Sequence, residues 1–207
     1  MKKLFTIAAV AVLGMTSVNA QDINFGAKAG VNFATITGDE TDGIESQTGF
    51  HVGVVAEIMI SEKFSFQPEL LYSAQGASDT FEDEFDKEEY TIKYDYINLP
   101  LMAKYYVAEG FSIEAGPQIG FLINSEAEYE YTNKEFPEFN ESETNDIKDF
   151  TNSIDFGVNF GLGYKLESGL NFGARYNLGL SNVNDGEGSD DLKNQNAVFQ
   201  VSVGFFF

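Results

Sequence analysis

Alternation of apolar and polar residues over long stretches is the feature that most constrains this chain. In eight segments every second residue is Ala, Val, Ile, Leu, Phe, Tyr or Pro, 50 positions in all, while the residues between them are mostly Gly, Asn, Ser, Gln or charged. The segments are residues 23–33, 50–60, 64–74, 97–107, 111–123, 154–166, 170–180 and 197–207. Because successive side chains of a strand point to opposite faces, each segment is predicted to be a strand with one apolar face. Each is also long enough to cross a bilayer at a tilt, which takes about nine to eleven residues.

Residues 1–20 are predicted to be a cleaved signal peptide, which leaves residues 21–207 as a single domain. Lys2 and Lys3 form a positive start, and residues 4–12 are apolar but too short to span a bilayer. Small residues at 18–20 precede the expected cleavage point. The protein is therefore expected to be exported.

Composition excludes several kinds of chemistry. The chain has no Cys and one His, which excludes a disulfide framework, thiolate chemistry and the usual zinc enzymes. Its 33 acidic residues against 12 basic ones argue against a nucleic-acid partner, because binding nucleic acid requires a basic surface. No cofactor is expected.

Two barrels can be built from eight such strands: a soluble one with an apolar interior, or an outer-membrane one with an apolar exterior. Three-residue connections at 61–63, 108–110 and 167–169 alternate with long ones, as in outer-membrane barrels. The long connections, residues 35–48, 76–90, 124–150 and 182–196, hold 24 acidic and 4 basic residues. The prediction is an all-β fold: an eight-stranded antiparallel up-and-down transmembrane β-barrel with long acidic external loops and short periplasmic turns. Its expected location is the bacterial cell outer membrane.

The residues between the apolar positions of the strands, which we call the polar phase, include equal numbers of acidic and basic residues. They are Lys28, Lys104, Lys165, Arg175, Glu57, Glu69, Glu114 and Asp155. Unpaired charges are costly in a confined interior, and an eight-stranded barrel is only about wide enough for side chains. Six of them lie at similar depth from the short turns and are predicted to form one charge network that plugs the lumen: Lys28, Glu57, Glu69, Lys104, Glu114 and Arg175. Glu57 and Glu69 are expected to be cross-strand neighbours, with Arg175 or Lys104 between them.

Four short motifs resemble the PorT-type outer-membrane β-barrel family, also called porin-family proteins. They are FQPELLYSAQG at 66–76, YINLPLMAKYY at 96–106, GPQIGF at 116–121 and ARYNLGL at 174–180. The resemblance covers essentially residues 21–207 and implies the barrel and its location, but no activity. It does not extend to the secretion role of the member that names the family.

Two departures from simple strands are expected. Tyr90, Ile92, Tyr94 and Tyr96 alternate in the phase opposite to Ile97 onward, so the strand either has a bulge near Tyr96 or begins at Ile97. The prolines inside strands, Pro68, Pro100 and Pro117, each remove a hydrogen-bond donor and predict local bulges or interrupted pairing.

Two groups of residues suggest chemistry only weakly. His51 lies near Ser46 and Glu45 and could pair with Asp155, but such a local cluster does not make a catalytic site, and no catalysis is predicted. Carboxylates in two loops offer oxygen ligands for weak Ca²⁺ or Mg²⁺ binding: Asp83, Glu84, Asp86, Asp185, Asp190 and Asp191. Neither loop has the spacing of a dedicated calcium loop, so no metal site is predicted.

Three functions remain open. The first is a structural or interaction barrel that presents its acidic loops; the alternatives are a small porin or channel for small solutes and, less favoured, a membrane lipid-modifying enzyme. Expected partners are outer-membrane lipid and lipopolysaccharide, and the barrel insertion machinery, which would bind the C-terminal strand ending at Phe207. The protein is expected to be monomeric.

Overall fold

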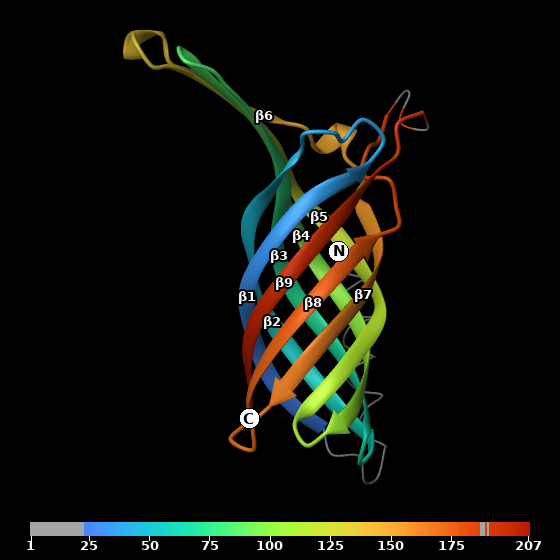
Figure 1. The fold of residues 1–207 in the computed structure, drawn as a ribbon. Coiled ribbons are helices and arrows are strands. Elements are labelled where there is room, and N and C mark those ends of the chain that lie inside the picture. The colour runs from blue at the N-terminus through green and yellow to red at the C-terminus, as the bar shows by residue number, and fades with distance from the viewer. Residues whose placement is uncertain (1–22, 187–188, 190) are drawn as a thin grey trace.

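Eight long antiparallel strands close into a ring in the computed structural model, which describes residues 23–186, 189 and 191–207 (Figure 1). The strands are β1 (Ile23–Gly38), β2 (Glu45–Ser61), β3 (Phe64–Glu82), β4 (Asp86–Ala108), β5 (Phe111–Asn133), β7 (Ile154–Lys165), β8 (Leu170–Gly179) and β9 (Asn194–Phe206). Each pairs with its neighbour in the chain, and β1 pairs with β9 to close the ring. The predicted all-β barrel is confirmed. The predicted signal peptide lies outside the described residues and stays a prediction.

Three shorter elements lie at one end of the ring. Strand β6 (Glu141–Asp146) pairs with the outer part of β5, and two short 3₁₀ helices, η2 (Pro137–Phe139) and η3 (Lys148–Phe150), flank it. The three short turns lie at the opposite end, which we call the turn end. In the part of the chain that the structure describes, no helix has the length and apolar character needed to cross a membrane.

The apolar phase of the strands points out of the ring. On β9, Val201 and Val203 are each 46% exposed, whereas the alternate residues Gln200 and Ser202 are buried. The same alternation recurs on the other long strands, where Phe, Leu and Val are exposed and Asn, Gln and charged residues are buried. A soluble barrel would have the reverse arrangement, so the geometry is that of a barrel whose exterior meets lipid.

Two of the predicted long loops are largely strand. β3 and β4 continue as a hairpin to Glu82 and Asp86, and β5 continues to Asn133 before β6 pairs back onto it. These extensions leave the rim of the barrel and project away from it (Figure 1). We call them the arm, defined as residues 79–94 and 125–146. The prediction of loops fails here because backbone pairing between the strands continues beyond the barrel wall.

A bulge lies near Tyr96, but on the partner strand. Asp95 pairs with Asn124 and Tyr96 with Leu122, so the extra residue is Ile123 of β5. Strand β4 therefore begins well before Ile97, and its side chains alternate between the two faces without interruption near Tyr96. As a result its apolar residues at the far end, including Tyr96, point into the barrel.

The prolines interrupt pairing without shifting it. The ladder between β3 and β4 lapses from Pro68 to Leu71, and that between β4 and β5 lapses from Pro100 to Ala103, with the same register on both sides of each gap. Pro117 of β5 falls within the second gap. Proline has no backbone N–H to donate, so interrupted pairing, one of the two predicted outcomes, is the one that occurs.

Candidate functional site

The lumen contains an arginine that holds two buried carboxylates. Arg175 of β8 donates to Glu69 of β3 through Nη1 (2.9 Å) and Nη2 (2.7 Å), and to Glu114 of β5 through Nε (3.1 Å) and Nη2 (2.9 Å). Lys28 of β1 lies 3.4 Å from Glu69. All four side chains are buried. The planar guanidinium is suited to this role because it presents several donors in fixed directions.

A second cluster surrounds Glu57 nearer the turn end. Its carboxylate lies 2.7 Å from the Lys165 ammonium and 3.3 Å from that of Lys104. It also accepts hydrogen bonds from the hydroxyls of Ser65 (3.0 Å) and Tyr106. The predicted network does not contain Lys165. The sequence feature that identifies this lysine as a member is its position among the inward-facing polar residues, close to a short turn.

Gln67 joins the two clusters. Its amide nitrogen donates to Glu69 (2.7 Å), and its amide oxygen accepts from Lys104 (3.1 Å). The six predicted side chains thus lie together in the lumen, in two linked groups rather than one ring. Their role as a plug remains a prediction.

The expected pairing of Glu57 with Glu69 is wrong. Glu69 lies opposite Val55 on β2, and the Ile58–Phe66 pair places Gln67 opposite Glu57. Glu69 is one residue further from the turn than Glu57, since the Ser61–Phe64 pair would place Pro68 opposite Glu57. The irregularity in the register between Met59 and Ser61 adds one more residue to this offset. Arg175 holds Glu69 together with Glu114, whereas the ion pairs of Glu57 are with Lys104 and Lys165.

An apolar cluster lies inside the other end of the lumen. Five buried residues from four strands meet there: Ile36, Ala77, Tyr94, Tyr96 and Leu122. Ile44, Ile92 and Ile147 pack against them. We call this group the apolar seal. It was not predicted, because the inner face of the barrel was expected to be polar throughout.

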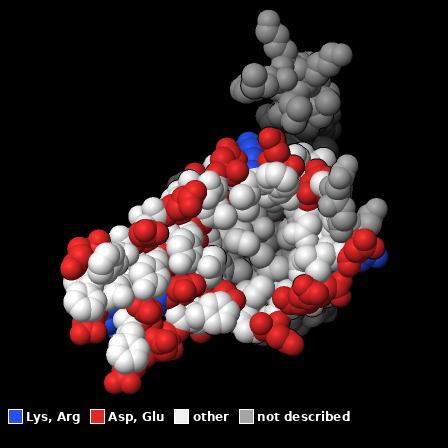
Figure 2. All heavy atoms as spheres, turned by 90° about the horizontal axis from the view of Figure 1, so that it is seen from above, with Lys and Arg blue, Asp and Glu red and all other residues white. Residues whose placement is uncertain are grey.

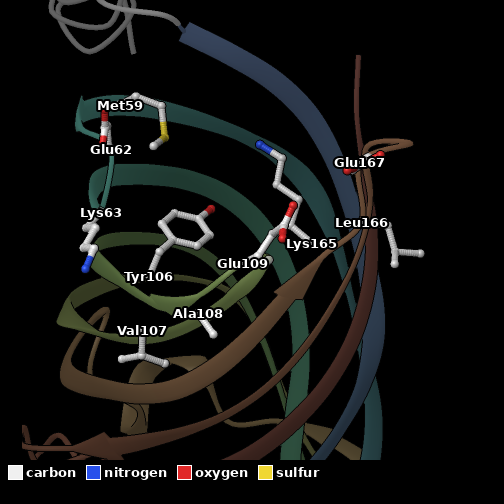
Figure 3. A pocket seen from close by; sticks show the side chains of 11 residues that line it. Met59, Glu62, Lys63, Tyr106, Val107, Ala108, Glu109, Lys165, Leu166 and Glu167 are labelled. Atoms are coloured by element: carbon white, nitrogen blue, oxygen red, sulfur yellow. The ribbon is translucent and has the colours of Figure 1, made fainter.

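Little space remains among the charged side chains of the lumen. A cavity of about 20 Å³ lies among Lys28, Gln67, Lys104 and Glu114, which is room for about one water molecule. A wider vestibule of about 560 Å³ opens at the turn end (Figure 3). Tyr106 and Lys165 line it, and both hold Glu57, so the Glu57 cluster forms its inner wall.

His51 is not placed as a catalytic histidine. It is 1% exposed, and its Nδ1 lies 2.8 Å from Oδ1 of Asn32. Ser46 and Glu45 are exposed at the rim. Asp155, which could pair with His51, instead accepts a hydrogen bond from Ser181 (3.0 Å), and no hydrogen bond or ion pair joins the two described side chains of Asp155 and His51. The histidine lies among the polar side chains that fill the lumen.

The loop carboxylates form local hydrogen bonds. Asp83 accepts from the backbone N–H groups of Asp86 and Phe85 (2.8 Å each), which hold the pKa of its carboxyl below the usual range. Asp86 accepts from Tyr131 (2.7 Å).

The other loop acids add no cluster. Asp185 accepts from the N–H of Gly186 (2.9 Å), Glu84 and Asp191 are exposed, and Asp190 lies outside the described residues. Across residues 23–186, 189 and 191–207 no three acidic or histidine side chains are grouped as a metal ion would require. Weak cation binding stays a prediction.

The arm carries much of the negative charge. Its two segments hold 15 acidic residues and 3 lysines, a net charge of −12. Seen from that end of the barrel, acidic side chains surround the mouth and continue along the arm (Figure 2). Basic side chains are few on this face.

Comparisons with known proteins agree with this geometry. A family model described as "Outer membrane protein beta-barrel domain" matches residues 19–185. No curated protein gives a significant match.

Several solved structures of barrels are similar. Ail of Yersinia pestis is 11% identical with a TM-score of 0.46, over 89% of this chain and 98% of that one. Neisserial surface protein A is 13% identical with a TM-score of 0.46, over 88% and 97%. OprG of Pseudomonas aeruginosa is 10% identical with a TM-score of 0.43, over 91% and 98%. By its match to the family model, the chain belongs to the outer membrane protein β-barrel domain family, and it is a protein of the bacterial outer membrane.

Proposed function

We propose that the protein is a non-conducting outer-membrane barrel whose role is to hold the acidic arm outside the cell for interaction with a partner. The observation that carries this proposal is the double closure of the lumen. Buried ion pairs fill the half nearer the short turns, and the cavity between these charged side chains is about 20 Å³. The apolar seal, together with buried polar side chains such as Asp155 and Asn196, occupies the other half. A solute would have to displace both.

The two closures resist opening for different reasons. Moving Arg175 away from Glu69 and Glu114 would leave buried charges without partners, which is strongly unfavourable. Opening the apolar seal would expose Tyr96 and Leu122 to water. Conduction would require both costs at once, so the packed interior favours a structural role for the barrel over transport.

The arm supports the interaction role. It continues β3, β4 and β5 past the barrel wall and adds β6, all six of whose residues are exposed. An ordered sheet that leaves the rim gains nothing from lipid and adds nothing to the closure of the ring. Its strong charge and exposed aromatic side chains suit contact with another molecule.

Finer assignments belong to the same proposal. Membership of the PorT-type group is supported by the four motifs, which lie on β3, β4, β5 and β8. Cleavage after residue 20 is supported by the sequence of residues 1–20. Lipid and lipopolysaccharide would surround the apolar exterior, and the insertion machinery would bind β9, beyond which Phe207 is 83% exposed.

Single-channel recording in a planar lipid bilayer tests the proposal. The purified, refolded protein should give no steady openings, whereas steady large openings would overturn the proposal in favour of a small channel. The enzymatic alternative is tested separately by comparing the lipids of cells that carry the wild-type chain with those of cells that carry His51→Ala. A lipid change that depends on His51 would contradict a purely structural barrel.

A further inference from the structure

The two faces of the arm differ in chemistry. Pairing places Tyr90 opposite Asp79 on one side and Tyr129 on the other, and Tyr129 opposite Glu143. The neighbouring row on the same face contains Phe81, Glu88, Tyr131 and Glu141, and Asp86 follows. We call this the tyrosine face. All five aromatic residues within the paired strands of the arm are on this face, because residues two apart on a strand share a face. They are Phe81, Tyr90, Tyr94, Tyr129 and Tyr131.

All three lysines of the arm lie on the opposite face. Lys87 pairs with Glu89 (2.5 Å), Lys93 with Glu128 (2.5 Å) and Lys134 with Glu82 (2.9 Å). We call this the lysine face. It holds further acids, Glu126, Glu130 and Asp146, but no aromatic residue in its paired strands.

The carboxylates of the tyrosine face have no such partners. Within the described part of the chain, no Lys, Arg or His nitrogen lies within 4.0 Å of the carboxylates of that face, Asp79, Asp86, Glu88, Glu141 and Glu143. Their side-chain donors are uncharged: Asp86 accepts from the Tyr131 hydroxyl and the Asn133 amide (2.9 Å), and the Tyr90 hydroxyl lies 3.4 Å from Glu88. Charge is therefore compensated on one face and left uncompensated on the other.

Aromatic rings on the outer part of the tyrosine face are accessible. Phe81 is 61% and Tyr90 is 46% exposed, and the rings of Tyr90 and Tyr129 are 4.8 Å apart with a 39° tilt. A ring face next to an unpaired carboxylate attracts a cation by two mechanisms, the ring quadrupole and the negative charge. Arginine is the best match, because its planar guanidinium can stack on an aromatic ring and donate hydrogen bonds to a carboxylate at the same time.

We propose that the tyrosine face binds an extended, arginine-rich segment of a protein partner. This inference rests on the proposed interaction role of the arm and adds the chemistry of the partner. An anionic partner would meet five uncompensated carboxylates. An uncharged apolar partner would bury those carboxylates without compensation, which is costly.

Peptide binding tests the assignment on the whole protein in nanodiscs of zwitterionic lipid. Fluorescent peptides of alternating arginine and serine, lysine and serine, and glutamate and serine are titrated at physiological ionic strength, with empty nanodiscs as the blank. The arginine peptide should bind most tightly, the lysine peptide less tightly and the glutamate peptide not at all.

Matched variants separate this face from general attraction to an acidic protein. Glu88→Gln with Glu143→Gln removes two charges from the tyrosine face, and Glu126→Gln with Glu130→Gln removes two from the lysine face. The first pair should weaken arginine-peptide binding about threefold to tenfold more than the second. Tyr90→Thr with Tyr129→Thr, which keeps every charge, should reduce the preference for arginine over lysine.

Three results would overturn the inference: no binding of the arginine peptide, equal loss in the two charge-removal pairs, or an unchanged arginine preference in the tyrosine variant. Native gel mobility of each variant establishes that the barrel is folded. A sealed barrel that fails to bind the peptide would refute this inference alone. A conducting barrel would refute the proposed function instead.

Discussion

Replacing Arg175 with Gln should destabilise the barrel more than any other single loss of charge in the lumen. The guanidinium donates four hydrogen bonds to Glu69 and Glu114, and the side chains of the three residues are 2%, 0% and 6% exposed, respectively. In Arg175→Gln two carboxylates remain, with only Lys28 close to one of them. Removing one partner from a buried pair typically costs about 3–5 kcal/mol. The expected loss in the free energy of unfolding is of that size.

Urea-dependent unfolding and refolding in lipid vesicles measures this loss. Lys165→Gln is the matched control, because Lys165 is 25% exposed and Glu57 keeps Lys104 and two hydroxyl donors. It should cost about 1 kcal/mol or less, in the range of partly exposed pairs.

A double variant tests the electrostatic reason. Arg175→Gln with Glu114→Gln leaves Lys28 facing Glu69 and restores neutrality, so it should be more stable than Arg175→Gln alone. Two results would refute the reasoning: a loss below about 1 kcal/mol for Arg175→Gln, or a double variant that loses the sum of the two single changes.

Three further predictions follow from burial and hydrogen bonding. Val54, 59% exposed on the lipid side, should tolerate Arg poorly, at a cost of about 2–4 kcal/mol near the bilayer midplane; Val55→Thr, inside the lumen, should cost less in the same refolding assay. Leu122→Ala should cost about 2–5 kcal/mol by opening a cavity in the apolar seal, and a smaller effect on unfolding would show that the seal is loosely packed. Backbone hydrogen bonds lower the pKa of Asp83 below its ordinary value of 3.8. Their contribution to the stability of the turn should therefore be complete above pH 3.8 and be lost only as the pH falls through the lowered pKa. An NMR titration midpoint at or above 3.8 would contradict this.

The barrel could be predicted because lipid imposes a regular pattern. Each strand must show apolar residues at every second position, and the sequence from Ala197 to Phe207 does so without exception. The buried location of Glu69, Glu114 and Arg175 follows from the same alternation. Their grouping was suggested by equal numbers of opposite charges at a common depth.

The arm and the apolar seal could not be read in the same way. An extension outside the membrane has no lipid face, so its dense charge resembled a loop, although Tyr90, Ile92 and Tyr94 already alternated. The seal draws single residues from distant strands, such as Ile36 and Leu122, and only closure of the ring brings them together.

The arrangement of Glu57 and Glu69 depends in part on an irregularity that turn length does not reveal. A shift between Met59 and Ser61 changes which residues face each other across β2 and β3. The extra residue Ile123 has a similar effect, since it reverses the phase of β5 and leaves that of β4 unchanged. A bulge moves the following side chains to the opposite face of the sheet, but no characteristic residue type in the sequence marks its position here.

Accessibility of a cysteine inside the lumen tests the sealed barrel most directly. The chain has no native cysteine, so single substitutions report only on their own positions. Ser73 is 0% exposed and lies on β3 between Glu69 of the charge network and Ala77 of the apolar seal. A charged thiol reagent should modify the exposed control Ser142→Cys rapidly and leave Ser73→Cys unmodified until the protein is unfolded in urea. Modification of folded Ser73→Cys at the rate of the control would contradict a lumen closed at both ends.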